Sequence, residues 1–521
     1  MTVTKTISTF HGGLKLKGNK QLSTGTAIAA AAAVSQYVIP LQQHIGAISE
    51  SLVSIGEHVL KGQMIAKPGS TISAAVHAPV SGTITAIDRQ PVPHVSGLPD
   101  YCITIDNDFK DKWVKTQPLA EDYNNHTSRD LRQLLRDAGI VGLGGATFPS
   151  DIKETEMDTH TLILNGVECE PYITCDDMLM RERAQQVLAG ADIIGHIIKA
   201  HECIVAIENN KPEAIKAMQA VIDADGTGFF RLQVIPTLYP SGGEKQLIKI
   251  ITGKEVPSGH FPGELDVLCH NVATAYAIYQ AIYEARPLIS RIMTVTGHGI
   301  KQPQNIEVLI GTPMKDCIEQ CGGYINDNCE LIMGGPMMGL TLQSDHLPVI
   351  KATNCLLIRP CTEAADTKTH LPCIRCGKCV EVCPVQLLPQ QLYWYTSCKN
   401  MERVKNHHLF DCIECGCCAY VCPSDIPLVQ YYRFAKTEIR HKQQQRIASD
   451  TARQHHEAHQ QRLERQKQER EQRLRKKREM LAARNKNTDS NNKEAITDAI
   501  ARAKAKKAER EQAATKQPVK Q

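Results

Sequence analysis

The sequence has few aromatic residues and no long apolar segment. Of its 521 residues, two are tryptophan and eight are phenylalanine, and aromatic residues make up 5% of the chain. No apolar run reaches the ~18 residues that a membrane-spanning helix needs. The Ala-rich stretch 27–34 is too short and too weakly apolar, and residues 1–13 lack the apolar core of a secretory signal peptide. We therefore expect about three or four domains in a cytoplasmic or peripheral protein that depends on partners for any membrane attachment.

The net charge is also small, at +4, but it is unevenly distributed. From Arg440 onward there are 23 Lys and Arg residues against 11 Asp and Glu, whereas the rest of the chain is slightly acidic. Residues 440–521 are predicted to form a basic, charged, low-complexity tail, either helical or disordered. No apolar heptad seam is sustained there, so a coiled coil is not supported. The tail could attract anionic lipid, RNA or an acidic partner, but a solvated arm is favoured and no specific nucleic-acid target is expected.

Cysteine, by contrast, is abundant, with 20 residues. Eight of them form two copies of the pattern C-x2-C-x2-C-x3-C-P: Cys373, Cys376, Cys379 and Cys383, then Cys412, Cys415, Cys418 and Cys422. In two-cluster ferredoxins with this pattern, the fourth cysteine binds the cluster held by the other motif. The expected ligand sets for two [4Fe–4S] clusters are therefore Cys373, Cys376, Cys379 and Cys422, and Cys412, Cys415, Cys418 and Cys383. The sequence thus predicts a protein that moves single electrons.

Structural zinc is the main alternative for these motifs. Zinc sites use C-x2-C pairs, but two such pairs are normally separated by a longer spacer and lack a third cysteine at the same spacing. A disulfide scaffold is disfavoured because such scaffolds are typical of small secreted chains. Cys417 adjoins Cys418 without keeping the spacing, so it is interpreted as a spare buried thiol.

The N-terminal region, residues 1–115, is predicted to contain short strands and tight turns. The phrases GEHVLKGQMIA and VHAPVSGTITAI alternate apolar and polar residues and contain Gly or Pro at their turns. They resemble the barrel-sandwich hybrid domain of lipoyl and biotinyl carriers, in which a lysine at a hairpin tip holds the cofactor. Here Thr71 stands in that place, so the resemblance implies the shape without the carrier chemistry. His77, near the following turn, is interpreted as structural.

Residues 128–290 are predicted to form an α/β domain. A helix is expected at 131–138, followed by a Gly-rich turn at 139–149 that would let backbone N–H groups approach a phosphate, with a helix N-terminus behind it. The buried strand 161–164 leads into Asn165, and two carboxylates follow within the next five residues. Ligands of open α/β sheets bind at this end of the strands, so a ribityl chain, a ribose or a nicotinamide is a suitable ligand class.

Three phrases here resemble the flavoprotein subunit of respiratory complex I: GLGGATFPSDIK, LNGVECEPYITCDD and YPSGGEKQLIKIITGKEVP. The resemblance implies an FMN site with NAD(H) as substrate. The matching positions are Gly142, Gly144, Gly145 and Lys153 in the loop, Asn165, Glu168 and Glu170 at the strand end, and Gly243 and Glu244 in the third phrase. Leu143 and Thr147 depart from the family's loop, and the alternative is a retained fold with an inactive pocket. No catalytic side chain is assigned.

Two further modules are expected downstream. Residues 291–345 resemble the soluble-ligand-binding β-grasp module that follows the flavin domain in complex I, with Met337 and Met338 interpreted as packing residues. Residues 360–436 would hold the two clusters in a helical ferredoxin module, because 387–404 has helical spacing between the motifs. The predicted fold is thus multidomain α+β.

This order of modules is similar to that of RnfC, a subunit of the Rnf ion-translocating electron-transport complex. The phrases LPCIRCGKCVEVCPVQLLPQQLYWY and LFDCIECGCCAYVCPSDIPLVQYYR carry the resemblance. It implies a peripheral subunit of a translocase, on the cytoplasmic face of the bacterial inner membrane. Such a protein would pass electrons between NAD(H) and membrane partners that move Na+ or H+. The alternative is a soluble redox-sensing or scaffold iron–sulfur protein without ion coupling.

Overall fold

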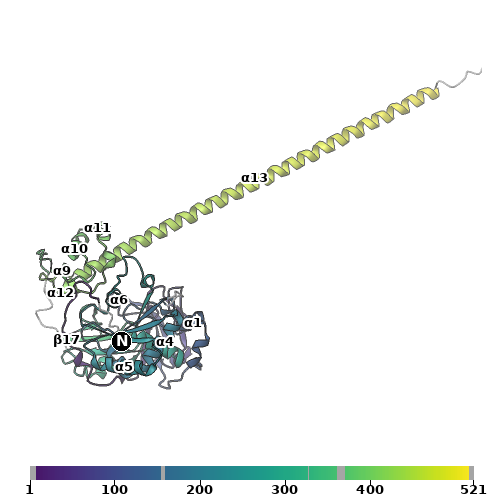
Figure 1. Cartoon of the computed structure of the whole chain (residues 1–521). Coiled ribbons are helices and arrows are strands. Elements are labelled where there is room, and N and C mark those ends of the chain that lie inside the picture. Colours follow the sequence, from purple (N-terminus) through teal and green to yellow (C-terminus); the bar gives the residue numbers. More distant parts are fainter. Residues whose placement is uncertain (1–7, 154–158, 327, 361–369, 515–521) are drawn as a thin grey trace, which may run out of the picture. The chain divides into compact units, whose positions relative to one another are not determined.

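The computed structural model describes residues 8–153, 159–326, 328–360 and 370–514 (Figure 1). Residues 1–436 form one compact unit and residues 437–521 form a second. The first unit contains three β-containing modules and a helical cysteine module.

The N-terminal module consists of two small antiparallel sheets around one apolar core. One sheet has the order β2 (Gln36–Pro40), β8 (Asp100–Asn107), β7 (Gly82–Gln90), β4 (His58–Val59), and the other β3 (Glu50–Ser51), β5 (Met64–Lys67), β6 (Val76–His77). Tyr37, Ile39, Ile65 and Ile84 are fully buried between the sheets. The alternating apolar residues therefore face inward, as expected for a barrel-sandwich arrangement.

The hairpin between β5 and β6 is docked on the neighbouring α/β module. The guanidinium of Arg136 donates to the carbonyl oxygens of Ser70 (2.6 Å) and Thr71 (3.0 Å), and it pairs with Asp151 (3.2 Å). The backbone N–H of Ile45 donates to the carbonyl of Thr147 in the glycine-rich loop (3.2 Å). The position of the carrier lysine is thus fixed against the loop that was predicted to bind flavin.

The α/β module is built on a parallel sheet of order β11–β10–β9–β12. Its strands are β9 (Thr161–Asn165), β10 (Glu202–Glu208), β11 (Phe230–Ile235) and β12 (Val267–Asn271). Its helices are α1 (Ser128–Asp137), α2 (Ser150–Lys153), α3 (Cys175–Glu182), α4 (Ala184–Ile198), α5 (Pro212–Asp225), α6 (Glu244–Thr252) and α7 (Val272–Tyr283). The near-continuous apolar runs of β9 and β10 are buried, as is usual for parallel strands covered on both faces. Gly190 lets α4 approach α7, because a Cβ there would lie 1.8 Å from the carbonyl oxygen of Ala275.

The β-grasp module has a six-stranded mixed sheet of order β1–β14–β13–β17–β15–β16. The strands are β1 (Ala29–Ala30), β13 (Ser290–Thr296), β14 (Gln304–Leu309), β15 (Cys329–Met333), β16 (Leu340–Leu342) and β17 (Cys355–Pro360), with α8 (Met314–Gln320) packed on it. Two of these strands, β1 and β17, lie outside the range 291–345. The Ala-rich stretch near residue 30 therefore supplies an edge strand to a distant module.

The cysteine module is helical, and its described residues 370–427 contain no strand. Its helices are α9 (Lys378–Glu381), α10 (Pro389–Ser397), α11 (Met401–Asn406), α12 (Cys417–Tyr420) and the first turns of α13 (Leu428–Ala514). The prediction of a single helix over 387–404 was wrong, because the chain breaks at Lys399, where φ is +53°. The side chain of Asn400 then caps α11 by accepting from the N–H of Arg403 (3.2 Å).

The second unit contains the remainder of α13, which is a single continuous helix of 87 residues (Figure 1). Its described side chains beyond residue 440 are almost all exposed, with ion pairs four residues apart such as Arg475 with Glu479. The tail is thus a helix over the residues described, one of the two forms that its composition allows. No helix among the described residues is both long enough and apolar enough to cross a membrane.

Candidate electron-transfer site

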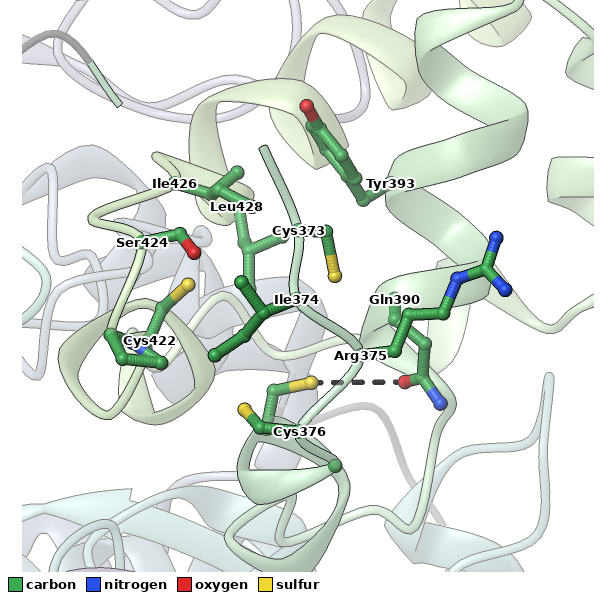
Figure 2. A pocket seen from close by; sticks show the side chains of 13 residues that line it. Cys373, Ile374, Arg375, Cys376, Gln390, Tyr393, Cys422, Ser424, Ile426 and Leu428 are labelled. Carbon is green, nitrogen blue, oxygen red and sulfur yellow. Dashed lines mark hydrogen bonds between the residues drawn. The ribbon is translucent and has the colours of Figure 1, made fainter. Parts of the chain in front are cut away.

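The first cysteine pocket combines residues from both motifs. It is lined by Cys373, Cys376 and Cys379 of the first motif and by Cys422 of the second, around about 410 Å³ of empty space. Sulfur atoms of the labelled cysteines face a common space from the opposing segments (Figure 2). This pocket is open to solvent: Cys376 is exposed, and Ile374 in its wall is 67% exposed. We call it the outer pocket.

The second pocket has the complementary set of cysteines. It is lined by Cys412, Cys415 and Cys418 together with Cys383 of the first motif, around about 360 Å³. Cys383, Cys415 and Cys418 are each less than 10% exposed. We call it the inner pocket. The fourth cysteine of each motif therefore lies with the first three cysteines of the other, as the spacing predicted.

The two motifs have the same backbone at matching positions. Arg375 and Glu414 each precede the second cysteine and have a φ of +58°, and Gly377 and Gly416 follow it with φ of +81° and +80°. Non-glycine residues rarely adopt this left-handed conformation. Its repetition at the same two places in both motifs gives each three-cysteine turn the same path around its pocket.

The thiol chemistry of these pockets fits an iron–sulfur cluster. Burial raises the pKa of the Cys412 thiol to about 11 and also raises the pKa of Cys379 and Cys383. The thiols would stay protonated without a bound cation, whereas a bound metal deprotonates a coordinating thiol. Four sulfur donors and almost no oxygen or nitrogen donors suit iron–sulfur clusters. The pairing of each fourth cysteine with the other motif also favours clusters over zinc, and the ligand assignment remains a prediction.

Cys417, which the spacing could not place, is a packing residue of the inner pocket. It is fully buried and belongs to a small apolar cluster with Tyr239 and the neighbouring Cys415. Leu14, Cys169 and Met337 pack against the same cluster. Cys417 thus lies on the side of the inner pocket that contacts the α/β and β-grasp modules.

The three phrases predicted to bind flavin and NAD(H) converge at the carboxyl ends of β9 and β12. The amide of Asn165 donates to the carbonyl of Gly242 (2.9 Å), beside Gly243. The ammonium of Lys153 donates to the carboxylate of Glu244 (2.8 Å) and to the carbonyl of Cys269 (2.6 Å). Gly142, Gly144, Gly145, Asn165, Lys153, Gly243 and Glu244 therefore gather in one region of the sheet edge.

The glycine-rich loop is a closed turn. The N–H of Gly142 donates to the carbonyl of Phe148 (2.9 Å), and the N–H of Thr147 donates back to Gly142 (3.1 Å). A Cβ on Gly145 would meet nothing within 4 Å, so this glycine faces open space, while Gly144 lies against Asn271. The following helix α2 has only four residues, so the expected contribution of a helix N-terminus to phosphate binding is weak.

Leu143, one of the two departures from the flavoprotein pattern, points into the protein. It is 5% exposed, and its N–H donates to the hydroxyl of Thr274 (2.9 Å). The substitution thus anchors the loop to α7 and leaves its glycines facing outward.

Glu168 holds the loop after β9 in place. Its carboxylate accepts from the N–H groups of Asp176 (2.7 Å) and Asp177 (3.3 Å), and it lies 3.7 Å from the ammonium of Lys20. Burial raises its pKa to about 7, with Lys20 opposing the shift. Glu168 therefore fixes the start of α3, and Lys20 stabilises the loop further by donating to three of its carbonyl oxygens.

Glu170 connects the α/β module to the β-grasp module. One of its oxygens accepts from the N–H groups of Met337 (2.7 Å) and Met338 (3.1 Å), and burial raises its pKa. Gly335 allows this contact, because a Cβ there would lie 2.0 Å from the Glu170 side chain. The carbonyl of Met337 in turn lies close to Gly416 of the inner pocket. The two predicted carboxylates thus bond to backbone, and one of them leads towards the cysteines.

Four contributors were missed by the sequence analysis: Lys20, Asp176, Asn271 and Tyr239. The amide of Asn271 donates to Asp176 (2.6 Å), and the hydroxyl of Tyr239 donates to the carbonyl of Cys415 (2.6 Å). Asn271 has a readable signal, since it is a polar residue at the end of an apolar strand that also caps α7. Lys20 lies about 150 residues before its partners, and no local pattern indicates it.

Four family models match successive parts of the chain. They are the RnfC barrel-sandwich hybrid domain (residues 8–110), the Nuo51 FMN-binding domain (135–280), the SLBB domain (292–341) and the 4Fe-4S dicluster domain (372–426). Together with the two cysteine pockets, they define an iron–sulfur protein of the electron-transport class, with an α/β domain of the FMN-binding type.

Curated relatives identify the family more narrowly. The RnfC protein of the ion-translocating oxidoreductase complex of Pseudomonas aeruginosa is 48% identical over 88% of this chain and 59% of its own length. Its counterpart in Serratia proteamaculans is 44% identical over 96% of the chain and 70% of its own length, and that of Yersinia pestis is 45% identical over 88% and 74%. The chain belongs to this family, RnfC. This membership confirms the predicted recognition and the predicted order of folds.

The chain is shorter than these relatives, spanning 59% of the first and 70% of the second. Among solved structures, an NAD+-reducing [NiFe]-hydrogenase in the H2-reduced state has a TM-score of 0.42 at 18% identity, covering 58% of this chain and 61% of its own. That likeness is too weak to support an argument.

Proposed function

We propose that this chain relays electrons between NAD(H) and the other subunits of a membrane-bound, ion-translocating oxidoreductase. The observation that carries the proposal is the pair of four-cysteine pockets, one open to solvent and one joined to the FMN-type domain. The relatives' name describes an ion-translocating complex. Movement of Na+ or H+, attachment to the cytoplasmic face of the bacterial inner membrane and contact with partner subunits are parts of the proposal.

In this proposal, the outer and inner pockets each hold one [4Fe–4S] cluster through the ligand sets given above. The loop of Gly142, Gly144 and Gly145 would hold the phosphate of FMN, because glycines allow close approach of backbone N–H groups to an anion. When bound, FMN would exchange the electron pair of a hydride for the single electrons that clusters carry. Asn165, Lys153 and Glu244 fix the surrounding loops, and Glu168 and Glu170 set the shape of the strand end.

The proximity of the inner pocket to the α/β domain supports an order of transfer. Tyr239 belongs to the third flavoprotein-like phrase and bonds to Cys415, whereas the outer pocket faces solvent. The inner cluster would then exchange electrons with the flavin, and the outer cluster with a partner.

Anaerobic purification with analysis of iron, sulfide and flavin tests this proposal. We expect about eight iron atoms per chain, bound FMN, and bleaching of the cluster absorbance on addition of NADH. A chain with full iron but no flavin and no response to NADH would contradict the NAD(H)-linked relay.

A soluble redox sensor is the second candidate, and the exposure of Cys376 favours it, since an accessible cluster is open to oxidants. The two candidates differ in what reduces the clusters. A sensor predicts loss of iron on exposure to oxidant and no reduction by NADH, whereas a relay predicts rapid reduction by NADH before any iron is lost.

A further inference from the structure

The peptide carbonyls of the inner pocket accept hydrogen bonds from side chains. The pairs are His11 Nδ1 with Cys383 (3.0 Å), Lys436 Nζ with Cys412 (2.6 Å) and Tyr239 Oη with Cys415 (2.6 Å). In the part of the chain that the structure describes, no side chain donates to the carbonyl of an outer-pocket cysteine: Cys373, Cys376, Cys379 or Cys422. The two pockets therefore differ in the polarity of their immediate surroundings, although their backbones match.

Tyr239 reaches the inner pocket from a different module. It is 3% exposed, and its backbone forms a two-way pair with Leu14. It begins the short loop 239–244, and Gly242 near the far end of that loop bonds to Asn165. One loop thus contacts both the predicted flavin site and the inner cysteine pocket.

A hydroxyl that donates to a carbonyl polarises the whole peptide group. The N–H at the other end of the Cys415–Gly416 peptide becomes a stronger donor, because hydrogen bonds in a chain reinforce one another. Hydrogen bonds and positive dipoles near cluster sulfurs raise the reduction potential, since they stabilise the added electron. Burial strengthens the effect, because water does not screen these groups.

We propose that Tyr239 is a positioning residue for the inner pocket, and that its hydroxyl raises the one-electron reduction potential of the cluster held there. The inference rests on the proposed function, because it requires a cluster in the pocket. It adds that the flavin-type domain itself tunes the cluster next to it, through a residue outside the cysteine motifs.

Tyr239→Phe tests the inference, since it removes only the hydroxyl. A net hydrogen bond contributes about 0.5–1.5 kcal/mol. We therefore expect about a tenfold change in the reduction equilibrium of one cluster, a fall of roughly 59 mV in its potential. Iron, sulfide and flavin contents should stay at the parent values. The readout is a redox titration followed by electron paramagnetic resonance, which is independent of NADH activity.

Two controls identify the affected cluster. Arg375→Gln removes a positive charge beside the outer pocket and should lower the potential of the other cluster. Tyr324→Phe removes a hydroxyl that bonds to Asp345 in the β-grasp module, and it should change neither potential. Tyr239→Phe is expected to shift only the cluster that Arg375→Gln leaves unchanged.

The inference is overturned if Tyr239→Phe changes neither potential, changes both equally, or changes the same one as Arg375→Gln. If that variant fails to hold iron, His11→Leu replaces it, because His11 donates to the same pocket from the N-terminal segment. An unchanged inner potential in His11→Leu would then overturn it. Absence of iron from the parent chain would contradict the proposed function instead, so the two failures are distinguishable.

Discussion

The outer and inner pockets are built from the same motif but differ in almost everything around it. Arg375 in the outer motif is exposed and lies over the ring of Trp394. Its counterpart Glu414 in the inner motif is paired with Arg433 and Lys436. The backbone of each motif is thus set locally by cysteine spacing and left-handed turns, whereas burial and hydrogen bonding are set by distant segments. One sequence pattern can therefore give two clusters with different accessibility.

Removing one ligand from each pocket should give the largest contrast. Cys415→Ala and Cys376→Ala should each lose about half of the iron, because each cluster holds four iron atoms. In Cys376→Ala the inner cluster should still be reduced by NADH, but onward transfer to an external acceptor should stop. In Cys415→Ala the outer cluster should no longer respond to NADH. Iron analysis with spectroscopy of the NADH-treated variants measures both effects.

The first 350 or so residues should remain folded in Cys376→Ala, because this thiol lies at the surface. Full iron content in either variant would contradict the ligand assignment. NADH reduction of the outer cluster in Cys415→Ala would contradict the order of transfer.

Chelation should also separate the pockets. Under mild oxidation with a chelator present, we expect iron to leave in two phases of about equal size, because one cluster faces solvent and the other is buried. Alkylation of the partly depleted chain followed by mass analysis should modify Cys376 before Cys415 and Cys418. A single phase, or equal labelling of both sets, would show that the pockets have the same accessibility.

A smaller contrast is expected from the paired glycines. Gly377→Ala should destabilise the fold by about 1–2 kcal/mol, the cost of a left-handed conformation for a residue with a Cβ. Gly416→Ala should cost more, because its Cβ would also lie 2.7 Å from the carbonyl oxygen of Met337, whereas the site around Gly377 is open. Denaturant unfolding of the two variants measures the difference. Equal losses would mean that the Met337 turn moves away freely.

The sequence predicted the cysteine grouping because metal ligation imposes its geometry on local spacing. It also predicted the convergence of the glycine loop and the strand end, since carboxyl ends of parallel strands meet at one edge. It could not predict the donors to the inner pocket. His11 and Cys383 are separated by 372 residues, and Tyr239 and Cys415 by 176. Such contacts arise only when modules dock, and single-chain patterns do not record them.

Helix boundaries show a local limit of the same kind. The apolar spacing of residues 387–404 continues through Lys399, but the backbone does not. Asn400 is a common capping residue and was the available signal for a new helix start. Glu168 and Glu170 were correctly placed at a strand end, but their bonds to backbone N–H groups depend on α3 and on the β-grasp turn.

The docked hairpin of the N-terminal module has a mechanical consequence. A carrier domain must travel between reaction centres, and its hairpin tip moves with its cargo. Here the tip could leave only by breaking the bonds of Arg136 to Ser70 and Thr71. The shape that serves elsewhere as a swinging arm is used in this protein as a bracket, and it braces the glycine loop from behind.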